Sequence, residues 1–158
     1  MKKLLFSLVL VLSLFLVGCE EQEQGKYNEG TYFGHHEFNS RGNDFVTTAV
    51  VYVSEDGNIE SVFIDTTYVQ NEVNTTKKAL GEDYGMRETS ANIGVIEGGA
   101  EWYEQIEVLE EHILKNQGLD WIEWSNEEET ETDSVSGVTV TIDTYYAAVE
   151  MALNEALN

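Results

Sequence analysis

The chain has 158 residues, of which 42% are hydrophobic, and it carries 30 acidic against 8 basic side chains, for a formal net charge of −22. This length and apolar content suit one domain with its own core. So negative a chain repels phosphate backbones and anionic head groups, which excludes nucleic acid as a partner.

The first 18 residues, "MKKLLFSLVLVLSLFLVG", have the layout of a secretory signal: two lysines, an apolar run from Leu4 to Val17 and a small residue at the end. The run is too short for a membrane span, which needs roughly 20 apolar residues. With Cys19 the ending reads "LVGC", which resembles the bacterial lipobox, where diacylglycerol is attached to the cysteine and cleavage makes it the new amino terminus. The alternative is an ordinary cleaved signal followed by a chance cysteine.

Cys19 is the only cysteine, so no disulfide can form within the chain. We therefore expect a protein held to the cell membrane by acyl chains on Cys19, facing away from the cytoplasm. Removal of residues 1–18 takes two lysines and no acid, so the net charge changes from −22 to −24. Residues 19–29 are polar and without apolar periodicity, which predicts a tether, and residues 30–158 are expected to form the domain.

Three segments rich in β-branched and aromatic residues follow: "GTYFGHHEF", "FVTTAVVYV" and "IESVFIDTTYV". The last two are separated by "SEDGN", a hairpin turn signal, so three antiparallel strands are predicted. A short helix is predicted over residues 74–81, with Asn74 as its cap and Gly81 at its end. The predicted fold is α+β, with a small antiparallel sheet packed against two or three helices.

After a glycine-rich gap, residues 100–118 show the clearest helical pattern, because apolar side chains recur at helical spacing at Trp102, Ile106, Leu109 and Ile113. Residues 119–124, "LDWIEW", predict a brief strand, and residues 125–133 an acidic loop. The last segment predicts a helix capped by Asp143 or Thr144, with one apolar face made of Tyr146, Val149, Leu153 and Leu157.

The stretch "DSVSGVTVT", residues 133–141, offers four hydroxyls and a glycine. Its alternation predicts a strand with Val138, Val140 and Ile142 facing the core and the two threonines on the open face. Gly137 would let another backbone or a flat ligand come close, and the following helix would aim its free N–H groups at this region. By pattern alone, an amphipathic strand with exposed threonines is the commoner explanation, and a phosphate site is the alternative.

Several segments together resemble the FMN-binding domain family, which also occurs in the C subunit of the sodium-pumping quinone reductase. These are "EGTYFG", "VVYVSEDGNIESVFI" and "DSVSGVTVT". Two middle segments, "KKALGEDYGM" and "EWYEQIEVLEEHILKNQG", are similar to the lipoprotein branch that serves flavin-based extracellular electron transfer. The resemblance spans most of residues 26–157 in the right order.

In that family a flavin transferase, using FAD and magnesium, esterifies a threonine to the phosphate of FMN. By position the acceptor is Thr139, and the motif's other residues are Asp133, Ser136 and Gly137. Val138 departs from the family, where alanine is common, and its extra methyls either hinder the transferase or pack inward. Thr141 and the backbone near Ser136 are candidate donors to the phosphate or the flavin ring. Candidates for contact with the ring are Tyr84, Met86, Trp102 and Tyr103, each with core packing as the alternative, which is the favoured one for Trp102.

The resemblance implies a lipid-anchored electron carrier, with covalent FMN, that accepts electrons from a membrane dehydrogenase or quinol pool and passes them to external acceptors. The alternative is a flavin-free binding or adhesion lipoprotein of the same fold. The family also includes members whose signal peptide yields a pheromone, and "LSLFLVG" and "LFSLVL" resemble such peptides. We expect no metal, since His35 and His36 are adjacent on a strand and point to opposite faces. We also find no catalytic triad in the sequence.

Overall fold

Four antiparallel strands form one sheet in the order β1-β2-β3-β4. The computed structural model describes residues 25–157, so the predicted signal, the lipobox cysteine and the pheromone-like peptides lie outside the described residues. The strands are Gly30–Ser40 (β1), Asn43–Val53 (β2), Ile59–Gln70 (β3) and Val73–Thr76 (β4). The three predicted strands are confirmed, and β4 extends the sheet as a short ribbon against the end of β3.

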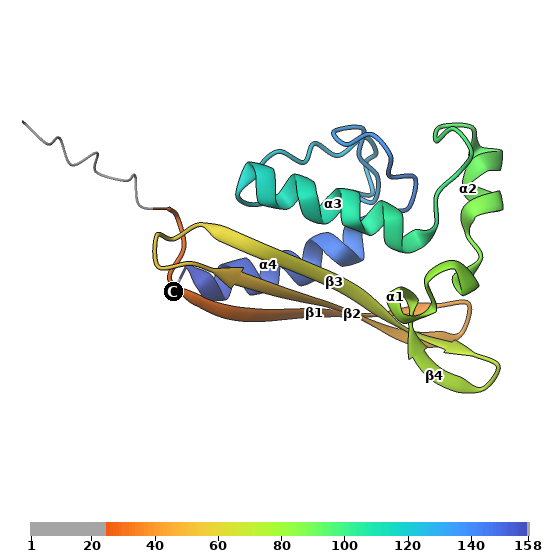
Figure 1. The fold of residues 1–158 in the computed structure, drawn as a ribbon, viewed down its shortest axis with the longest axis horizontal. Coiled ribbons are helices and arrows are strands. Elements are labelled where there is room, and N and C mark those ends of the chain that lie inside the picture. The colour runs from red at the N-terminus through yellow and green to blue at the C-terminus, as the bar shows by residue number, and fades with distance from the viewer. Residues whose placement is uncertain (1–24, 158) are drawn as a thin grey trace, which may run out of the picture.

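The helical elements follow the sheet in sequence, and the predicted α+β fold is confirmed. They are Lys77–Leu80 (α1), the 3-10 turn Gly81–Tyr84 (η1), Arg87–Ile93 (α2), Trp102–Asn116 (α3) and Asp143–Ala156 (α4). Helix α4 packs on β1 and β2, α3 runs beside β3, and both lie on the same side of the sheet (Figure 1). No helix within residues 25–157 is long and apolar enough to cross a membrane.

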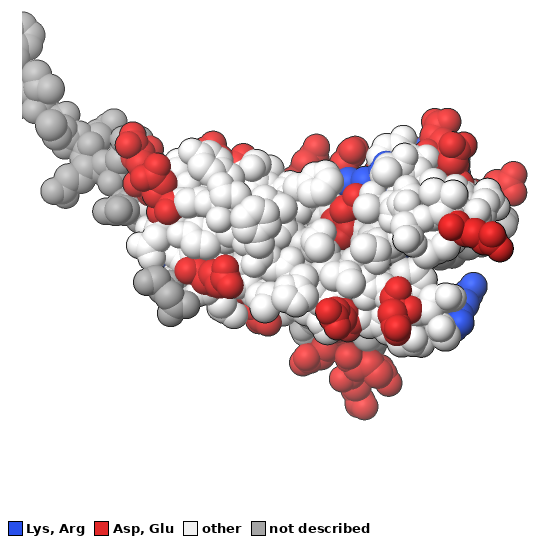
Figure 2. All heavy atoms as spheres, turned by 90° about the horizontal axis from the view of Figure 1, so that it is seen from below, with Lys and Arg blue, Asp and Glu red and all other residues white. Residues whose placement is uncertain are grey.

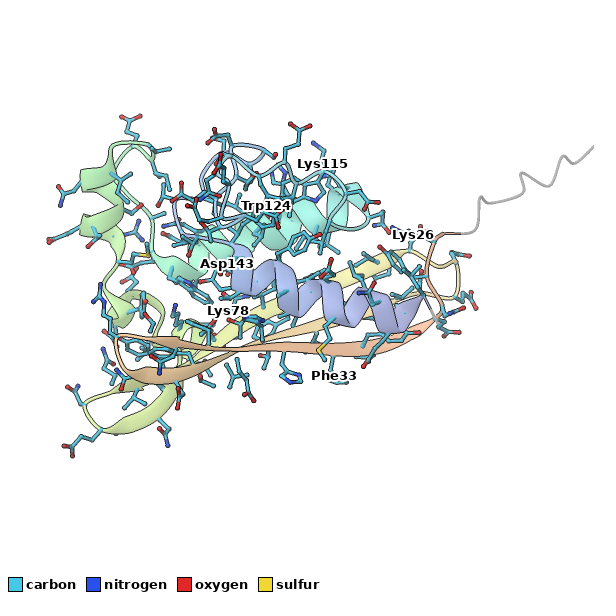
Figure 3. All side chains as sticks on the ribbon, turned by 180° about the vertical axis from the view of Figure 1, so that it is seen from behind. Lys26, Phe33, Lys78, Lys115, Trp124 and Asp143 are labelled. Carbon is cyan, nitrogen blue, oxygen red and sulfur yellow. The ribbon has the colours of Figure 1, made fainter. Side chains whose placement is uncertain are left out.

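The core lies between this side of the sheet and the two long helices. Because side chains alternate along a strand, every second residue of each long strand points into the core. Helix α3 contributes Trp102, Ile106, Leu109 and Ile113, as their helical spacing predicts. The opposite side of the sheet carries Phe33, Tyr52 and Phe63, which are 65%, 43% and 48% exposed. Phe33 accordingly points away from α4 (Figure 3).

Helix α4 approaches β1 very closely because small residues face each other. A Cβ built on Gly34 would collide with the carbonyl of Ala148. Ala148 and Ala152 are fully buried on the facing side of the helix, so the helix backbone rests directly on the strand. The predicted apolar face of α4 was partly wrong. Leu157, predicted to belong to it, is 47% exposed, whereas Tyr145, not predicted, is only 5% exposed.

Two helix starts also differ from the predictions. Helix α1 begins at Lys77, with Thr76 as its cap: the hydroxyl of Thr76 accepts from the Ala79 N–H at 3.3 Å. Asn74 instead lies in β4, which pairs with β3. Helix α4 begins at Asp143 after Ile142, and no side chain caps it. The residue that caps a helix depends on where the preceding strand or loop ends, and the local sequence pattern alone does not show that position.

Helix α3 covers the open edge of β3 with polar side chains. The carboxylate of Glu110 accepts from the N–H of Ile64 at 2.5 Å, and Gln117 both accepts from the N–H of Ile59 and donates to its carbonyl. Gln117 ends the helix in the left-handed conformation, one residue before the predicted stop at Gly118. These contacts satisfy backbone N–H and C=O groups that would otherwise be free to pair with a strand of another chain.

The packed part of the chain begins earlier than the predicted domain start at Gly30. Tyr27 is 5% exposed and belongs to the core, and the Gly25 N–H donates to the carbonyl of Asp56 at 2.6 Å. The N–H of Asn28 donates to the carbonyl of Ala156, which brings the start of β1 beside the end of α4 (Figure 1). Residues 25–29, expected in the tether, therefore lie on the domain.

Candidate functional site

The hydroxyl-rich loop, residues 133–142, lies along α3 and is not a strand. A Cβ on Gly137 would lie 3.9 Å from the methyls of Val108, and Thr139 contacts Gln105 one turn earlier in α3. The strand prediction was wrong because a strand needs the edge of a neighbouring strand, and a helix surface offers none. The inward direction of the valines is nevertheless as predicted, since Val138 and Val140 pack against the core.

Gln105 fixes Thr139 in place. Its side-chain oxygen accepts both from the backbone N–H of Thr139 at 2.7 Å and from the Thr139 hydroxyl at 3.1 Å. Gln105 is fully buried, so this amide has no competing water. Thr139 is thus half-buried rather than displayed on an open face, while Thr141 is exposed as expected.

The other end of the same amide reaches the start of α2. The Gln105 nitrogen donates to the carbonyl of Ala100 at 3.3 Å and to the hydroxyl of Ser90 at 3.5 Å, and it lies 3.9 Å from the sulfur of Met86. The structure therefore brings Met86 and Thr139, two of the predicted site residues, to opposite ends of one buried side chain. Helix α2 was not predicted from the sequence, where this segment was expected to be only a glycine-rich gap.

A carboxylate holds α2 against α3. Glu101 is 4% exposed and accepts from the N–H groups of Met86 and Arg87 at 2.8 and 3.1 Å. The Arg87 guanidinium binds Glu104 at 2.9 Å, and this hydrogen bond, with one from the Glu101 N–H, holds the pKa of the Glu104 carboxyl below its usual range. Charge-assisted contacts thus set the position of Met86.

Asp133 and Ser136, the remaining acid and hydroxyl of the motif, are exposed. Asp133 lines a shallow hollow of about 280 Å³ formed with residues 123–125 and Ser134, in which Thr139 takes no part. Trp124, also in this hollow, pairs with Thr132 through an isolated bridge, which is all that remains of the strand predicted over residues 119–124. The structure does not bring Asp133 together with Thr139.

The aromatic candidates belong to a different part of the molecule. Trp102 is 1% exposed and donates from its ring N–H to the hydroxyl of Tyr145 at 2.9 Å, so it is a core residue. Tyr84 contacts Trp102 with ring centroids 6.4 Å apart and Tyr68 edge-on at 5.2 Å. Tyr103 is half-buried one residue along α3.

Tyr84 lines a second and larger cavity, which we call the aromatic pocket. It has a volume of about 510 Å³ and lies between the β1–β2 turn, the end of β3 and η1. Its walls are Phe38, Ser40, Arg41, Asn43, Asp44, Phe45, Tyr68, Val69, Lys77 and Tyr84. None of the hydroxyl-rich loop lines it. The aromatic pocket was not predicted from the sequence, although strand alternation continued beyond the buried residues would place Phe38, Phe45 and Tyr68 on one face.

Lys77 joins the aromatic pocket to the core. Its ammonium lies 5.4 Å from the ring centre of Tyr84 and 5.1 Å from that of Trp102. Burial lowers the pKa of Lys77 to about 8, and the Asp65 carboxylate only partly opposes this shift. The group is therefore a desolvated cation held over two aromatic faces.

The histidines take no part in either site. His35 is exposed and His36 is half-buried on opposite faces of β1, and His112 on α3 lies 5.3 Å from the ring of Trp121. Across residues 25–157 no group of three or more His, Cys, Asp or Glu side chains could hold a metal ion.

Comparison of the chain with protein-family models, curated proteins and solved structures found no match.

Proposed function

We propose that this protein is a lipid-anchored, extracytoplasmic flavoprotein that carries electrons through an FMN joined to Thr139 by a phosphoester. The observation that carries the proposal is the attachment of Thr139 to the buried amide of Gln105 through both its N–H and its hydroxyl. A redox carrier needs its cofactor at a fixed point on the scaffold, and a threonine held by a fully buried side chain on α3 meets that need.

The residues around Thr139 suit an esterified phosphate. In the transfer, Thr139 Oγ bonds to the FMN phosphorus of FAD, the bond from that phosphorus to AMP breaks, and the hydroxyl proton is lost. Gln105 then keeps the Thr139 N–H as a donor, so the loop stays attached to α3. Ser136 and Thr141, both exposed on the same loop, offer hydroxyls to the phosphate, and Met86 offers a polarizable contact to the ring.

A covalent bond also solves an electrostatic problem. The mature chain would have a charge of −24, and acidic side chains are spread over the face seen in Figure 2. A helix N-terminus returns only about 0.3–1 kcal/mol to a bound anion, which is little against such a field. A flavin attached to Thr139 does not need high affinity for its site, because the covalent bond keeps its effective concentration there high. Esterification also removes one negative charge from the phosphate. When attached, the flavin supplies the one- and two-electron chemistry of the carrier.

The short distance from Cys19 to the domain supports a role at the membrane surface. Because Gly25 already binds the β2–β3 turn, only residues 20–24 separate it from the predicted acylated cysteine. Six residue steps extend to about 20 Å at most. An anchored domain on such a tether stays within reach of a membrane dehydrogenase as electron donor, and it passes electrons on to external acceptors.

The test is mass spectrometry of the protein co-expressed with a competent flavin transferase. We expect a mass increase of one FMN less one water on the peptide that contains Thr139, absent in Thr139→Ala and kept in Thr139→Ser. Thr141→Ala is the matched control, because Thr141 is an exposed hydroxyl on the same loop. An unmodified wild-type chain, with the variants folded by circular dichroism, would overturn the proposal.

Val138→Ala separates the carrier from a flavin-free binding lipoprotein. Val138 is half-buried and packs against the core, so we expect its methyls not to hinder the transferase. We therefore expect equal flavin content in the wild type and in Val138→Ala. A large gain in the variant would mean that the natural chain is poorly modified and would favour the binding protein.

A further inference from the structure

We propose that the aromatic pocket is a binding site for a free, planar aromatic molecule that carries a negative charge. The site is separate from the hydroxyl-rich loop, because no residue of 133–142 lines it. The inference does not depend on flavin attachment and goes beyond the proposed function.

The shape of the aromatic pocket suits a flat ring system. Phe38 and Phe45 are stacked with centroids 5.4 Å apart and planes inclined by 27°, and Phe45 and Tyr68 are stacked at 6.2 Å and 19°. Tyr84 stands edge-on to Tyr68 at the end of this row. A row of nearly parallel rings beside a cavity of about 510 Å³ is the size and surface that small aromatic ligands occupy.

The charge of the aromatic pocket is opposite to that of the protein. Residues 25–157 contain six basic side chains, and three of them form ion pairs: Lys26, Lys78 and Arg87. Arg41 and Lys77 form none within this part of the chain, and both line the aromatic pocket. In a chain with 30 acidic residues, two cations without carboxylate partners at one cavity indicate that the anion is supplied from outside.

The nearby carboxylates do not neutralise these cations. Asp65 accepts from the N–H groups of Thr66 and Lys78 at 2.8 and 3.0 Å, both through Oδ1, so this oxygen is committed to the backbone. Asp44, the one carboxylate among the lining residues, is exposed and accepts from the side chain of Asn39 at 2.8 Å. Asp65 therefore compensates the charge of Lys77 only in part, and within residues 25–157 Lys77 forms no ion pair that an incoming anion would have to displace.

A cationic ligand is disfavoured on the same grounds. Aromatic faces attract cations, but the ammonium of Lys77 already lies over Tyr84 and Trp102. A second positive charge would meet Lys77 and Arg41 at close range. A planar anion instead stacks on Phe38 and Phe45 and pairs with both cations. A neutral aromatic molecule could stack in the same way but could not form the ion pairs.

The affinity should depend on pH through Lys77. The titratable groups around it are Asp65 and Tyr68 on β3, Asp44 on β2, Tyr84 on η1 and Arg41 in the β1–β2 turn. Burial raises the pKa of Tyr84, so it stays neutral while Lys77 titrates. Because the pKa of Lys77 is about 8, the anion should bind more weakly as the pH rises past that value.

The experiment is isothermal titration of the full chain in lipid nanodiscs with 2-naphthoate, against its neutral counterpart 2-naphthylmethanol, with empty nanodiscs as the blank. We expect naphthoate to bind at least tenfold more tightly than the alcohol at pH 7. Arg41→Asn and Lys77→Met should each weaken naphthoate at least fivefold. Asn suits position 41, whose φ is 53°. Lys115→Gln, which removes an exposed charge at the far end of α3, should change nothing (Figure 3).

Three results would overturn the proposal. Equal affinity for naphthoate and the alcohol, or equal weakening by Arg41→Asn and Lys115→Gln, would show that the aromatic pocket does not recognise the charge. Loss of naphthoate binding in flavin-loaded protein but not in Thr139→Ala would show that the tethered flavin occupies the aromatic pocket, and that no free ligand does. Arg41 is exposed, so its variant keeps the fold even if Lys77→Met is destabilised.

Discussion

The sheet with α4 and the segment between α1 and α4 are held together in different ways. Where α4 meets the sheet, fully buried small and β-branched residues pack directly, as at Gly34 against Ala148 and around Ala49 and Val149. Within residues 77–142, α3 packs its apolar face into the core, but α2 and the hydroxyl-rich loop are attached to α3 by single polar side chains, above all Glu101 and Gln105. The first region should therefore respond to changes in volume, and the second to the loss of individual hydrogen bonds.

Gly34→Ala should be the most damaging change, because it attacks the closest contact of the first region. The added Cβ meets the Ala148 backbone, which no side-chain rotation relieves, so α4 must move away from β1. We expect the free energy of unfolding to fall by about 3 kcal/mol, in the range of overpacked cores. Urea denaturation measures this, with exposed Thr31→Ala on the same strand as control. A loss equal to that of the control would refute direct helix-on-strand packing.

Gln105→Ala tests the second region and should have an intermediate effect. It leaves the Thr139 N–H and the Ala100 carbonyl without their partner, which costs about 1–3 kcal/mol. Hydrogen exchange at Thr139 should become faster while exchange in β2 changes little, because the loop opens locally. Glu107→Ala, exposed on the same helix, is the control. Uniformly faster exchange in loop and sheet would mean that the two regions unfold as one.

Lys77 lies where the two regions meet, and its effect per pH unit should be the smallest of the three. Its pKa is about 8 in the folded protein, against roughly 10.4 in an unfolded chain. Between these values the unfolded chain binds the extra proton, so Lys77 makes the unfolding free energy rise with pH by at most about 1.4 kcal/mol per unit.

Urea denaturation of the wild type and of Lys77→Met between pH 8 and 10 checks this sign. The unfolding free energy of the wild type should rise relative to that of Lys77→Met as the pH rises, because Lys77 loses its buried charge. The matched control is Lys115→Met, which removes an exposed lysine on α3. A wild type that loses stability relative to Lys77→Met over this range would contradict the lowered pKa.

The sheet and the longest helix could be predicted because their signals are local. Alternation marks β2 and β3, and the spacing from Trp102 to Ile113 marks the face of α3 that is buried. Helix α2 escaped prediction because its start is stabilised by Glu101, fourteen residues later than Arg87, and its own seven residues carry no apolar stripe. The aromatic pocket escaped because its walls come from strands and turns far apart in the chain.

Periodic burial is encoded in neighbouring residues, so the amino-acid pattern was enough to predict the fold class, the inward direction of Val138 and Val140, and the buried face of α3 that includes Trp102. The position of the hydroxyl-rich loop on α3, the hydrogen bonds from Thr139 to Gln105 and the meeting of Arg41 with Lys77 at one cavity depend on the folded arrangement of distant segments. A hydrogen bond or a charge acts on whatever group the fold brings near, at any separation in sequence.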